Sequence, residues 1–156
     1  MLYWEDFTIG QTLEFGSYLV TEKETIEFAR EFDPQPFHID RVAAAEHYYG
    51  GIIASGWHTG AMCMRMMVDG YLHDSASVGS PGIETLRWKS PVRPGETLHV
   101  NAEVLDKSLP KSMPELGFIK FSHTVFNQLG EVKMTLVSSG MFLKDPARIT
   151  TTEASE

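Results

Sequence analysis

The spacing of apolar residues in the first third of the chain predicts an amphipathic helix. Thr21 and Glu24 have the spacing of a capping box, in which each side chain can satisfy a free backbone N–H. Charged residues fill one face of the segment that follows, and four apolar residues share the other face: Ile26, Phe28, Ala29 and Phe32. Since Pro34 disfavours helical geometry in the residue before it, the helix should end near Phe32 or Asp33.

A second helix is predicted to begin near Ser55 and Gly56 and to run toward Tyr71. Residues 61–68 are apolar on nearly every side of this helix, so we expect it to be buried almost all round. Its methionines are interpreted as flexible core filler rather than as ligands of a metal or cofactor.

The second half of the chain changes to the two-residue period of β-strands. Apolar and polar side chains alternate from Leu98 to Val104, and aromatic and β-branched residues dominate residues 118–126. Further strands are expected over residues 13–20, 83–88 and 132–143, with turns at residues 91–95 and 127–130. The predicted order is therefore strand, helix, apolar helix and then a run of antiparallel strands.

This order predicts an α+β hot-dog fold, in which a curved antiparallel sheet wraps around one apolar helix. An open sandwich would leave the methionine-rich helix without enough cover. Residues 1–145 are expected to form a single domain, because 156 residues suit one compact unit. The polar residues 146–156 are expected to form a flexible tail.

Hydrophobic content, net charge and cysteine number argue against several classes of protein. Hydrophobic residues make up 42% of the chain, which is enough for one core, yet no apolar run is long enough to suggest a membrane helix. The net charge of −8 argues against nucleic acid as the main partner, because binding phosphates needs a basic surface. A start without a basic and apolar leader and a single cysteine, Cys63, favour a reducing, cytoplasmic compartment.

Candidate chemistry is concentrated in residues 32–40. Asp33 and His38 are five residues apart in a predicted loop that Pro34 and Pro36 stiffen. Rigid placement of two proton-transfer groups is what acid–base catalysis requires. On spacing alone the alternatives stay open, since Asp33 could cap a turn and His38 could be a satisfied core histidine.

The segment resembles the hydratase motif of MaoC-like dehydratases and R-specific enoyl-CoA hydratases, Asp-x-Asn-Pro-x-His followed later by a small residue. Asp33, Pro36 and His38 match it directly, and an alanine at position 43 or 44 can supply the small residue. Gln35 stands where the family usually has Asn, and Phe32 stands where R-specific hydratases usually have Gly. These differences leave the proton-transfer pair intact and bear on the choice of substrate.

A second matching segment covers residues 50–59, where a small-residue stretch leads into the central helix. The resemblance implies that the Gly56 N–H holds the thioester carbonyl, as an oxyanion hole at a positive helix N-terminus would. Ser55 could simply be the N-cap of the helix, and both roles are compatible. Four flanking residues are predicted to contact the substrate: Gln35, Pro36, Ser55 and Trp57.

The family resemblance thus implies reversible hydration of a 2-enoyl-CoA to a 3-hydroxyacyl-CoA of R configuration. Asp33 and His38 would hold one water, one group taking a proton and the other delivering one. No metal or separate cofactor is expected, since coenzyme A is part of the substrate. Basic residues between 87 and 93 are candidates for its phosphates, although ordinary solvated charge explains them equally well.

Two other functions remain open at this point. A hot-dog acyl-CoA thioesterase would share the fold and ligand but release free CoA. A non-catalytic acyl-CoA-binding protein would not need both Asp33 and His38. A Ser55 hydrolase triad is disfavoured, because the chain lacks a Gly-x-Ser-x-Gly elbow. The resemblance also implies a homodimer or a larger homo-oligomer, and unpaired sheet edges favour one independently.

Overall fold

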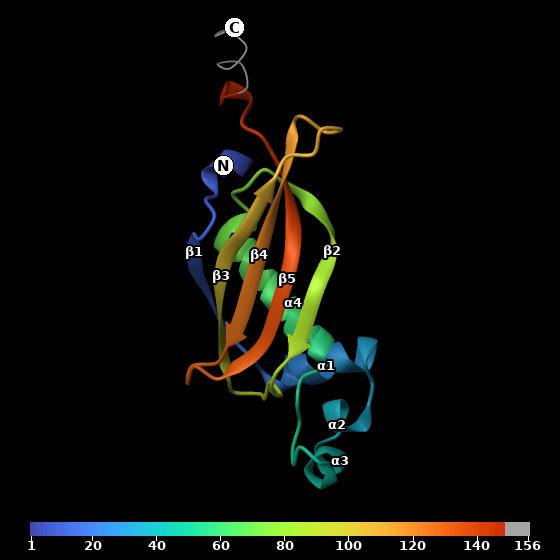
Figure 1. Cartoon of the computed structure of the whole chain (residues 1–156). Coiled ribbons are helices and arrows are strands. Elements are labelled where there is room, and N and C mark those ends of the chain that lie inside the picture. The colour runs from blue at the N-terminus through green and yellow to red at the C-terminus, as the bar shows by residue number, and fades with distance from the viewer. Residues whose placement is uncertain (149–156) are drawn as a thin grey trace, which may run out of the picture.

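A computed structural model describes residues 1–148 and shows one antiparallel sheet of five strands in the order β1-β3-β4-β5-β2 (Figure 1). The strands are β1 (Thr12–Leu19), β2 (Ser77–Trp88), β3 (Thr97–Ser108), β4 (Leu116–Phe126) and β5 (Val132–Leu143). The helical elements are η1 (Trp4–Asp6), α1 (Glu22–Phe32), α2 (Pro36–Ile39), α3 (Arg41–Glu46), α4 (Gly56–Met67) and the π-helical turn η2 (Val68–Leu72).

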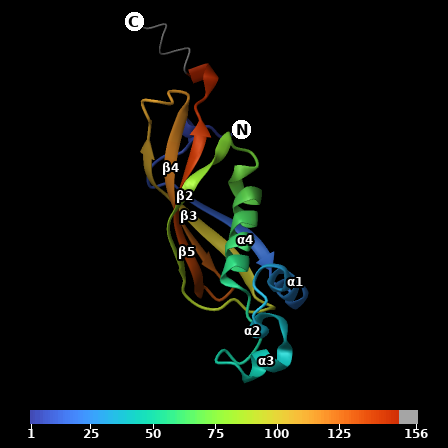
Figure 2. The same cartoon turned by 90° about the vertical axis from the view of Figure 1, so that its right-hand side faces the viewer.

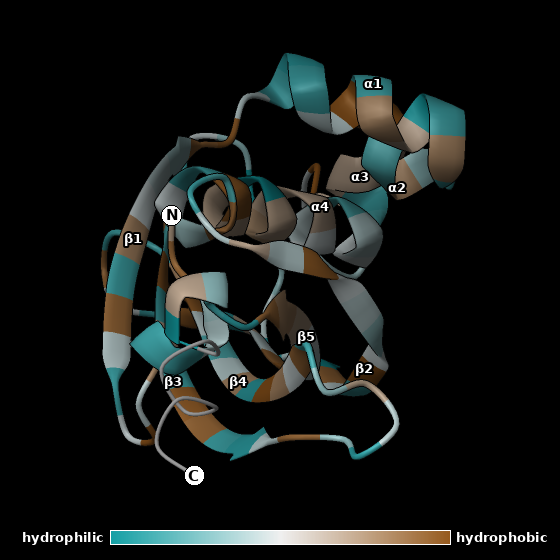
Figure 3. Ribbon diagram, turned by 90° about the horizontal axis from the view of Figure 1, so that it is seen from above, coloured by the Kyte–Doolittle hydropathy of each residue, from teal (hydrophilic) through white to brown (hydrophobic). Residues whose placement is uncertain are grey.

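The sheet curves around α4, with β1 on one side of the helix and β2 on the other (Figure 3). Side chains of α4 such as Met62, Cys63 and Met66 pack in the same buried cluster as Val100 of β3 and Phe121 of β4. This arrangement confirms the predicted hot-dog fold. None of the helices within residues 1–148 is long and apolar enough to cross a membrane.

The expectation that the central helix is buried all round is wrong in this chain. Met64 is 49% exposed, and Trp57, Ala61 and Arg65 are exposed on the same side of α4. The sheet covers only one face of a helix that lies on it, so an apolar composition alone could not reveal which face stays open.

Helix α1 begins and ends where the sequence predicts. The Thr21 Oγ1 accepts a hydrogen bond from the Glu24 N–H at 3.2 Å, while the Glu24 carboxylate turns away from the cap toward other partners. The buried face is rotated from the predicted one: Thr25 and Ala29 are buried, whereas Phe32 is 65% exposed. Helix α1 packs against α2 and α4, which decides this orientation.

Helices α1, α2 and α3 gather at the end of the sheet where α4 begins (Figure 2). The segment around His38 was predicted as a loop, but Pro36 starts the single helical turn α2, a position where its missing N–H costs nothing. Strand β2 begins at Ser77, earlier than the predicted residue 83. Gly79 and Gly82 lie at register shifts and interrupt the apolar alternation there, so the sequence pattern did not show the first part of the strand.

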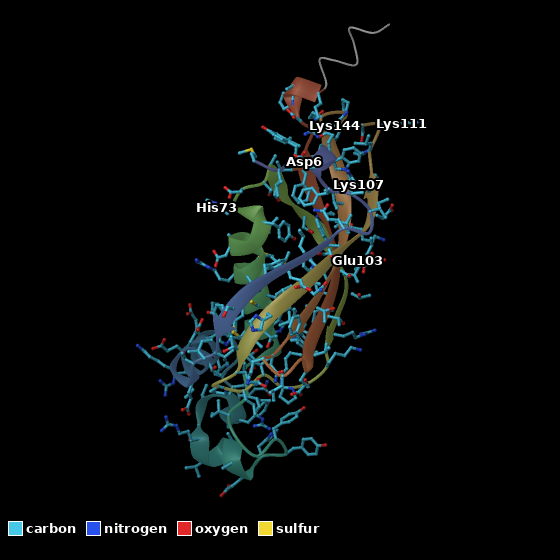
Figure 4. All side chains as sticks on the ribbon, turned by 90° about the vertical axis from the view of Figure 1, so that its left-hand side faces the viewer. Asp6, His73, Glu103, Lys107, Lys111 and Lys144 are labelled. Atoms are coloured by element: carbon cyan, nitrogen blue, oxygen red, sulfur yellow. The ribbon has the colours of Figure 1, made fainter. Side chains whose placement is uncertain are left out.

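Most of the predicted flexible tail, residues 149–156, lies outside the described part of the chain. Within that part, the Asp145 N–H donates to Glu5 at 3.0 Å, and Arg148 forms an ion pair with Asp6 at 2.8 Å. Asp6 and Lys107 mark this end of the molecule, opposite helices α1–α3 (Figure 4). Residues 145–148 are therefore held against the domain.

Candidate active site

A pocket of about 570 Å³ lies where α1, α2 and the start of α4 meet. Six of the seven predicted site residues line it: Asp33, Gln35, His38, Ser55, Gly56 and Trp57. Pro36 is the exception, since it begins α2 and is not among the lining residues. The fold thus brings together two segments that are about 20 residues apart in the chain.

The Asp33 and His38 side chains face each other in this pocket. Asp33 is the C-cap of α1, and its own N–H donates to the Ala29 carbonyl at 2.8 Å. His38 is only 4% exposed, and its Nε2 lies 3.3 Å from Asp33 Oδ2. A helix end and a one-turn helix therefore hold the two proton-transfer groups in direct contact.

The backbone of the next segment sets the tautomer of His38. Its Nδ1 lies 2.7 Å from the carbonyl oxygen of Ile53, which can only accept a hydrogen bond. Nδ1 must therefore carry a hydrogen, and the neutral ring presents a lone pair at Nε2 toward Asp33 and the pocket. A protonated ring would instead donate from Nε2 to the carboxylate.

Neighbouring polar groups keep the Asp33 carboxyl ionised. Partial burial raises the pKa of Asp33, but the nearby Ser55 hydroxyl, a hydrogen bond from Gln35 and, when its ring is protonated, the charge of His38 lower it below its ordinary value. The Gln35 Nε2 donates to Asp33 Oδ1 at 2.8 Å. Glutamine at this position therefore orients the carboxylate.

The first turn of α4 supplies free backbone donors beside this pair. Helix α4 begins at Gly56, and within residues 1–148 no protein group accepts a hydrogen bond from the Gly56 N–H. Ser55 occupies the N-cap position without making a side-chain capping bond, and its buried hydroxyl has no hydrogen-bond partner of standard length. The Gly56 N–H is thus available to a ligand, beside a Ser55 hydroxyl that lies near the Asp33 carboxyl.

The need for glycine at position 56 has a cause that the sequence did not reveal. A Cβ built on Gly56 would lie 2.5 Å from the indole of Trp88, whose Nε1 donates to the Gly56 carbonyl at 2.9 Å. Trp88 comes from the far end of β2, so no local pattern indicated this contact. The indole forms one wall of the pocket against the backbone of Gly56.

We expect Gly56→Val to lower hydratase turnover about a hundredfold, the scale seen when one oxyanion donor is lost, and Ser55→Ala to lower it far less. The valine side chain displaces Trp88 and with it the turn that presents the N–H. Steady-state kinetics with an enoyl thioester, on variants shown to be folded by thermal unfolding, measure the difference. Equal, small effects of both changes would contradict the oxyanion assignment.

The pocket has further aromatic walls that sequence reasoning missed. Phe37, Tyr48 and Tyr49 line it, and only the position of Phe37 directly before His38 could have indicated this. Among the basic candidates, Lys89 lines the pocket, whereas the Arg93 Nη2 donates to the Tyr49 carbonyl at 2.5 Å. Arg93 thus holds the loop of Tyr48 and Tyr49 in place.

Across the described residues there is no group of three or more histidine, cysteine and carboxylate side chains placed to hold a metal ion. Burial raises the pKa of the Cys63 thiol to about 12, so that cysteine is not a thiolate nucleophile.

Comparison with known proteins identifies the family of this chain. The family described as MaoC like domain matches residues 6–117. The YdeM protein of Bacillus subtilis is 32% identical over 130 residues, covering 83% of this chain and 90% of its own. A solved MaoC-like dehydratase from Rhodospirillum rubrum is 37% identical with a TM-score of 0.86, covering 94% of this chain and 99% of that one.

The solved R-hydratase PhaJ1 of Pseudomonas aeruginosa is 26% identical with a TM-score of 0.74, over 92% of this chain and 87% of that one. Three findings identify the same family: a family match over most of the chain, a relative above 30% identity and the shared hot-dog fold. The chain belongs to the MaoC-like dehydratase family.

Proposed function

We propose that the protein is a hydro-lyase that hydrates a 2-enoyl-CoA reversibly to a 3-hydroxyacyl-CoA. One observation carries this proposal: the His38 Nε2 and the Asp33 carboxylate lie 3.3 Å apart in a pocket that Gly56 also lines, and within residues 1–148 no protein group accepts a hydrogen bond from the Gly56 N–H. Membership of the MaoC-like dehydratase family and the likeness to an R-hydratase support hydratase or dehydratase chemistry.

The proposed reaction starts from an ionised Asp33, a neutral His38 and one water molecule bound between them. An ionised Asp33 and a neutral His38 with its hydrogen on Nδ1 both accept, so together they bind the two hydrogens of one water molecule. Imidazole is the stronger base of the two types of group, so His38 takes the proton as the water oxygen attacks the β-carbon. The carboxylate of Asp33 stabilises the imidazolium that forms.

The same proton completes the reaction. Attack at the β-carbon moves the π electrons to the thioester, and the Gly56 N–H stabilises the charge that develops on its oxygen. The imidazolium then returns its proton to the α-carbon, so that one water is added and both groups regain their resting state. In the dehydration direction the steps reverse, and water leaves from the β-carbon.

The choice of coenzyme A as the acyl carrier and the R configuration of the product are proposed from the resemblance to R-specific hydratases. The resemblance to R-specific hydratases supports an R-3-hydroxyacyl product, with coenzyme A as part of the substrate and no further cofactor. Lys89 at the pocket wall is the basic residue best placed for an anionic part of the ligand. A cytoplasmic location, where acyl-CoA is available, belongs to the same proposal.

A screen of enoyl-CoA thioesters of different chain lengths tests this function, with loss of the conjugated thioester absorbance as the readout. A thiol-reactive dye in the same assay detects free CoA. We expect hydration without release of thiol. Release of CoA would indicate a thioesterase instead, and binding of acyl-CoA without turnover would indicate a non-catalytic binding protein.

A homodimer is part of this proposal. Strand β2 is an edge of the sheet, and Val78 and Ile83 on it are 47% and 57% exposed. Pairing of β2 with a second copy would cover both side chains and satisfy the open backbone groups of the edge. The exposed face of α4 that carries Trp57 would then lie near the partner subunit.

We expect sedimentation velocity at micromolar concentration to show a dimer, and Ile83→Lys to shift the protein toward monomer, because a charge at the interface cannot be buried cheaply. Leu129→Lys is the matched control, since Leu129 is 83% exposed in the turn between β4 and β5. A fully active wild-type monomer would refute the dimer.

A further inference from the structure

Three polar side chains outside the pocket connect three separate elements of the fold. The Tyr18 hydroxyl of β1 donates a hydrogen bond to Glu24 Oε1 of α1. The same carboxylate oxygen lies 3.6 Å from the Nε2 of His58 on α4. Glu24 thus uses its carboxylate to join neighbouring elements rather than to complete the cap of α1.

Helix α1 holds the His58 ring from two positions one turn apart. The Phe28 ring stacks on the imidazole with ring centroids 4.5 Å apart and planes 9° from parallel, while Glu24 contacts its Nε2. His58 is 2% exposed and is not among the residues that line the pocket. Its side chain therefore acts in the contact between α1 and α4.

The hydrogen of the His58 ring belongs on the nitrogen that faces Glu24. Nδ1 is buried and has no hydrogen-bond partner in the described part of the chain, and an unpartnered N–H there would be costly. Burial lowers the pKa of His58, and the Glu24 charge opposes this only in part. The neutral ring thus directs its Nε2 hydrogen toward the carboxylate, 3.6 Å away.

This contact joins the helix that ends at Asp33 to the first turn of the helix that begins at Gly56. His58 follows Gly56 by two residues in the first turn of α4, and Asp33 caps the far end of α1. Figure 2 shows α1 beside the end of α4 where α4 begins. The separation between the Asp33 carboxylate and the Gly56 N–H depends on how α1 docks on α4.

We propose that Tyr18, Glu24 and His58 are positioning residues for the hydration reaction: they fix α1 on the first turn of α4 and so hold Asp33 opposite the Gly56 N–H. This inference rests on the proposed function. A displacement of about 1 Å in a catalytic constellation can lower the rate about a hundredfold without any change in the reacting groups.

The test compares Glu24→Leu with Glu24→Gln in the enoyl-CoA assay. Leucine removes the hydrogen bond with Tyr18 and the polar contact with His58, whereas the glutamine amide oxygen can still accept from Tyr18 and face the His58 Nε2. We expect Glu24→Leu to lower kcat at least about tenfold through misplacement of Asp33, and Glu24→Gln to restore most of it. KM should stay within about twofold, because none of the three residues lines the pocket.

Glu27→Leu is the matched control. Glu27 lies on the same helix, its side chain is 61% exposed, and its contact with Lys23 at 3.9 Å is a surface ion pair. We expect this variant to keep the wild-type kcat. Thermal unfolding shows whether each variant is folded at the assay temperature, which separates lost positioning from lost folded protein.

A second readout does not depend on turnover. Nitrogen-15 NMR of the His58 ring should show hydrogen on Nε2 in the wild type and a changed tautomer balance in Glu24→Leu. If the wild type hydrates substrate while folded Glu24→Leu keeps its kcat, or if Gln and Leu lose activity equally, the positioning role is wrong. A wild type that hydrates no enoyl thioester refutes the proposed function instead, and an Nδ1-protonated ring refutes the contact itself.

Discussion

Replacing Asp33 with Asn or His38 with Ala is expected to lower hydratase turnover at least about a hundredfold, the usual scale for losing a general acid or base. Asparagine fills the space of Asp33 but cannot stabilise an imidazolium at His38 Nε2, 3.3 Å away. Alanine at position 38 removes the group that takes the proton from water. Neither residue belongs to the hydrophobic core cluster around α4, so both variants should fold.

The measurement is steady-state hydration of the best enoyl-CoA in the screen, with circular dichroism to confirm the fold. His73 and Asp74 provide matched controls, since they form a contact of the same type at 3.4 Å with side chains 79% and 87% exposed. His73 lies at the other end of α4 from the pocket (Figure 4). His73→Ala and Asp74→Asn should be fully active. A folded Asp33 or His38 variant with near-normal activity would contradict the mechanism.

The second large effect concerns stability. The Lys133 side chain is 3% exposed, and its Nζ donates to the Pro91 carbonyl at 2.9 Å and to Glu96 Oε1 at 2.7 Å. Glu96 is further held by Asn127 at 2.9 Å and by the Arg93 N–H at 2.6 Å. The buried lysine thus ties β5 to the segment between β2 and β3.

We expect Lys133→Met to lower the free energy of unfolding by about 3–5 kcal/mol, because it leaves the Glu96 charge and the Pro91 carbonyl without their buried partner. Urea denaturation at neutral pH measures the change. Lys120→Met is the control: its ion pair with Glu84 is exposed at 36% and 56%, so the loss should be below about 1 kcal/mol. A similar small loss at Lys133 would contradict the assignment.

The stability difference between wild type and Lys133→Met depends on pH through the ionisation of the Glu96 carboxyl. Its burial raises the pKa of the carboxyl, but the Arg93 N–H, Lys133 and Asn127 lower it below the ordinary value of 4.5. A lowered folded-state pKa contributes stability that is present above the unfolded value and lost as pH falls through the folded one. The advantage of wild type over Lys133→Met should therefore persist at neutral pH and shrink below about pH 4.5.

The same network also shapes the active site. Lys133 holds the carbonyl of Pro91, and the next residue, Val92, accepts the Ala54 N–H at 2.8 Å directly before Ser55 and Gly56. Pro91 and Val92 both line the pocket. We therefore interpret the buried charge as a support for one wall of the site.

Local spacing alone was sufficient for the main features of the molecule. Alternation from Leu98 to Val104 located β3, aromatic and β-branched residues located β4, and the turn at residues 127–130 located the start of β5. The capping pattern at Thr21 located the start of α1. Asp33 and His38 are close in the chain, so their contact needs only a helix end and one helical turn. The sequence can predict such local features, because helix and strand geometry fixes how residues a few positions apart are placed relative to one another.

Only the tertiary structure decided the features that join distant segments. Trp88 meets Gly56, Lys133 meets Glu96, and Glu24 meets His58 across more than 30 residues each. These contacts depend on strand register and on the angle at which α1 packs on α4. The tautomer of His38 likewise depends on the Ile53 carbonyl, and the open face of α4 on which side the sheet covers. No periodic pattern encodes such choices, because many arrangements bury the same apolar residues equally well.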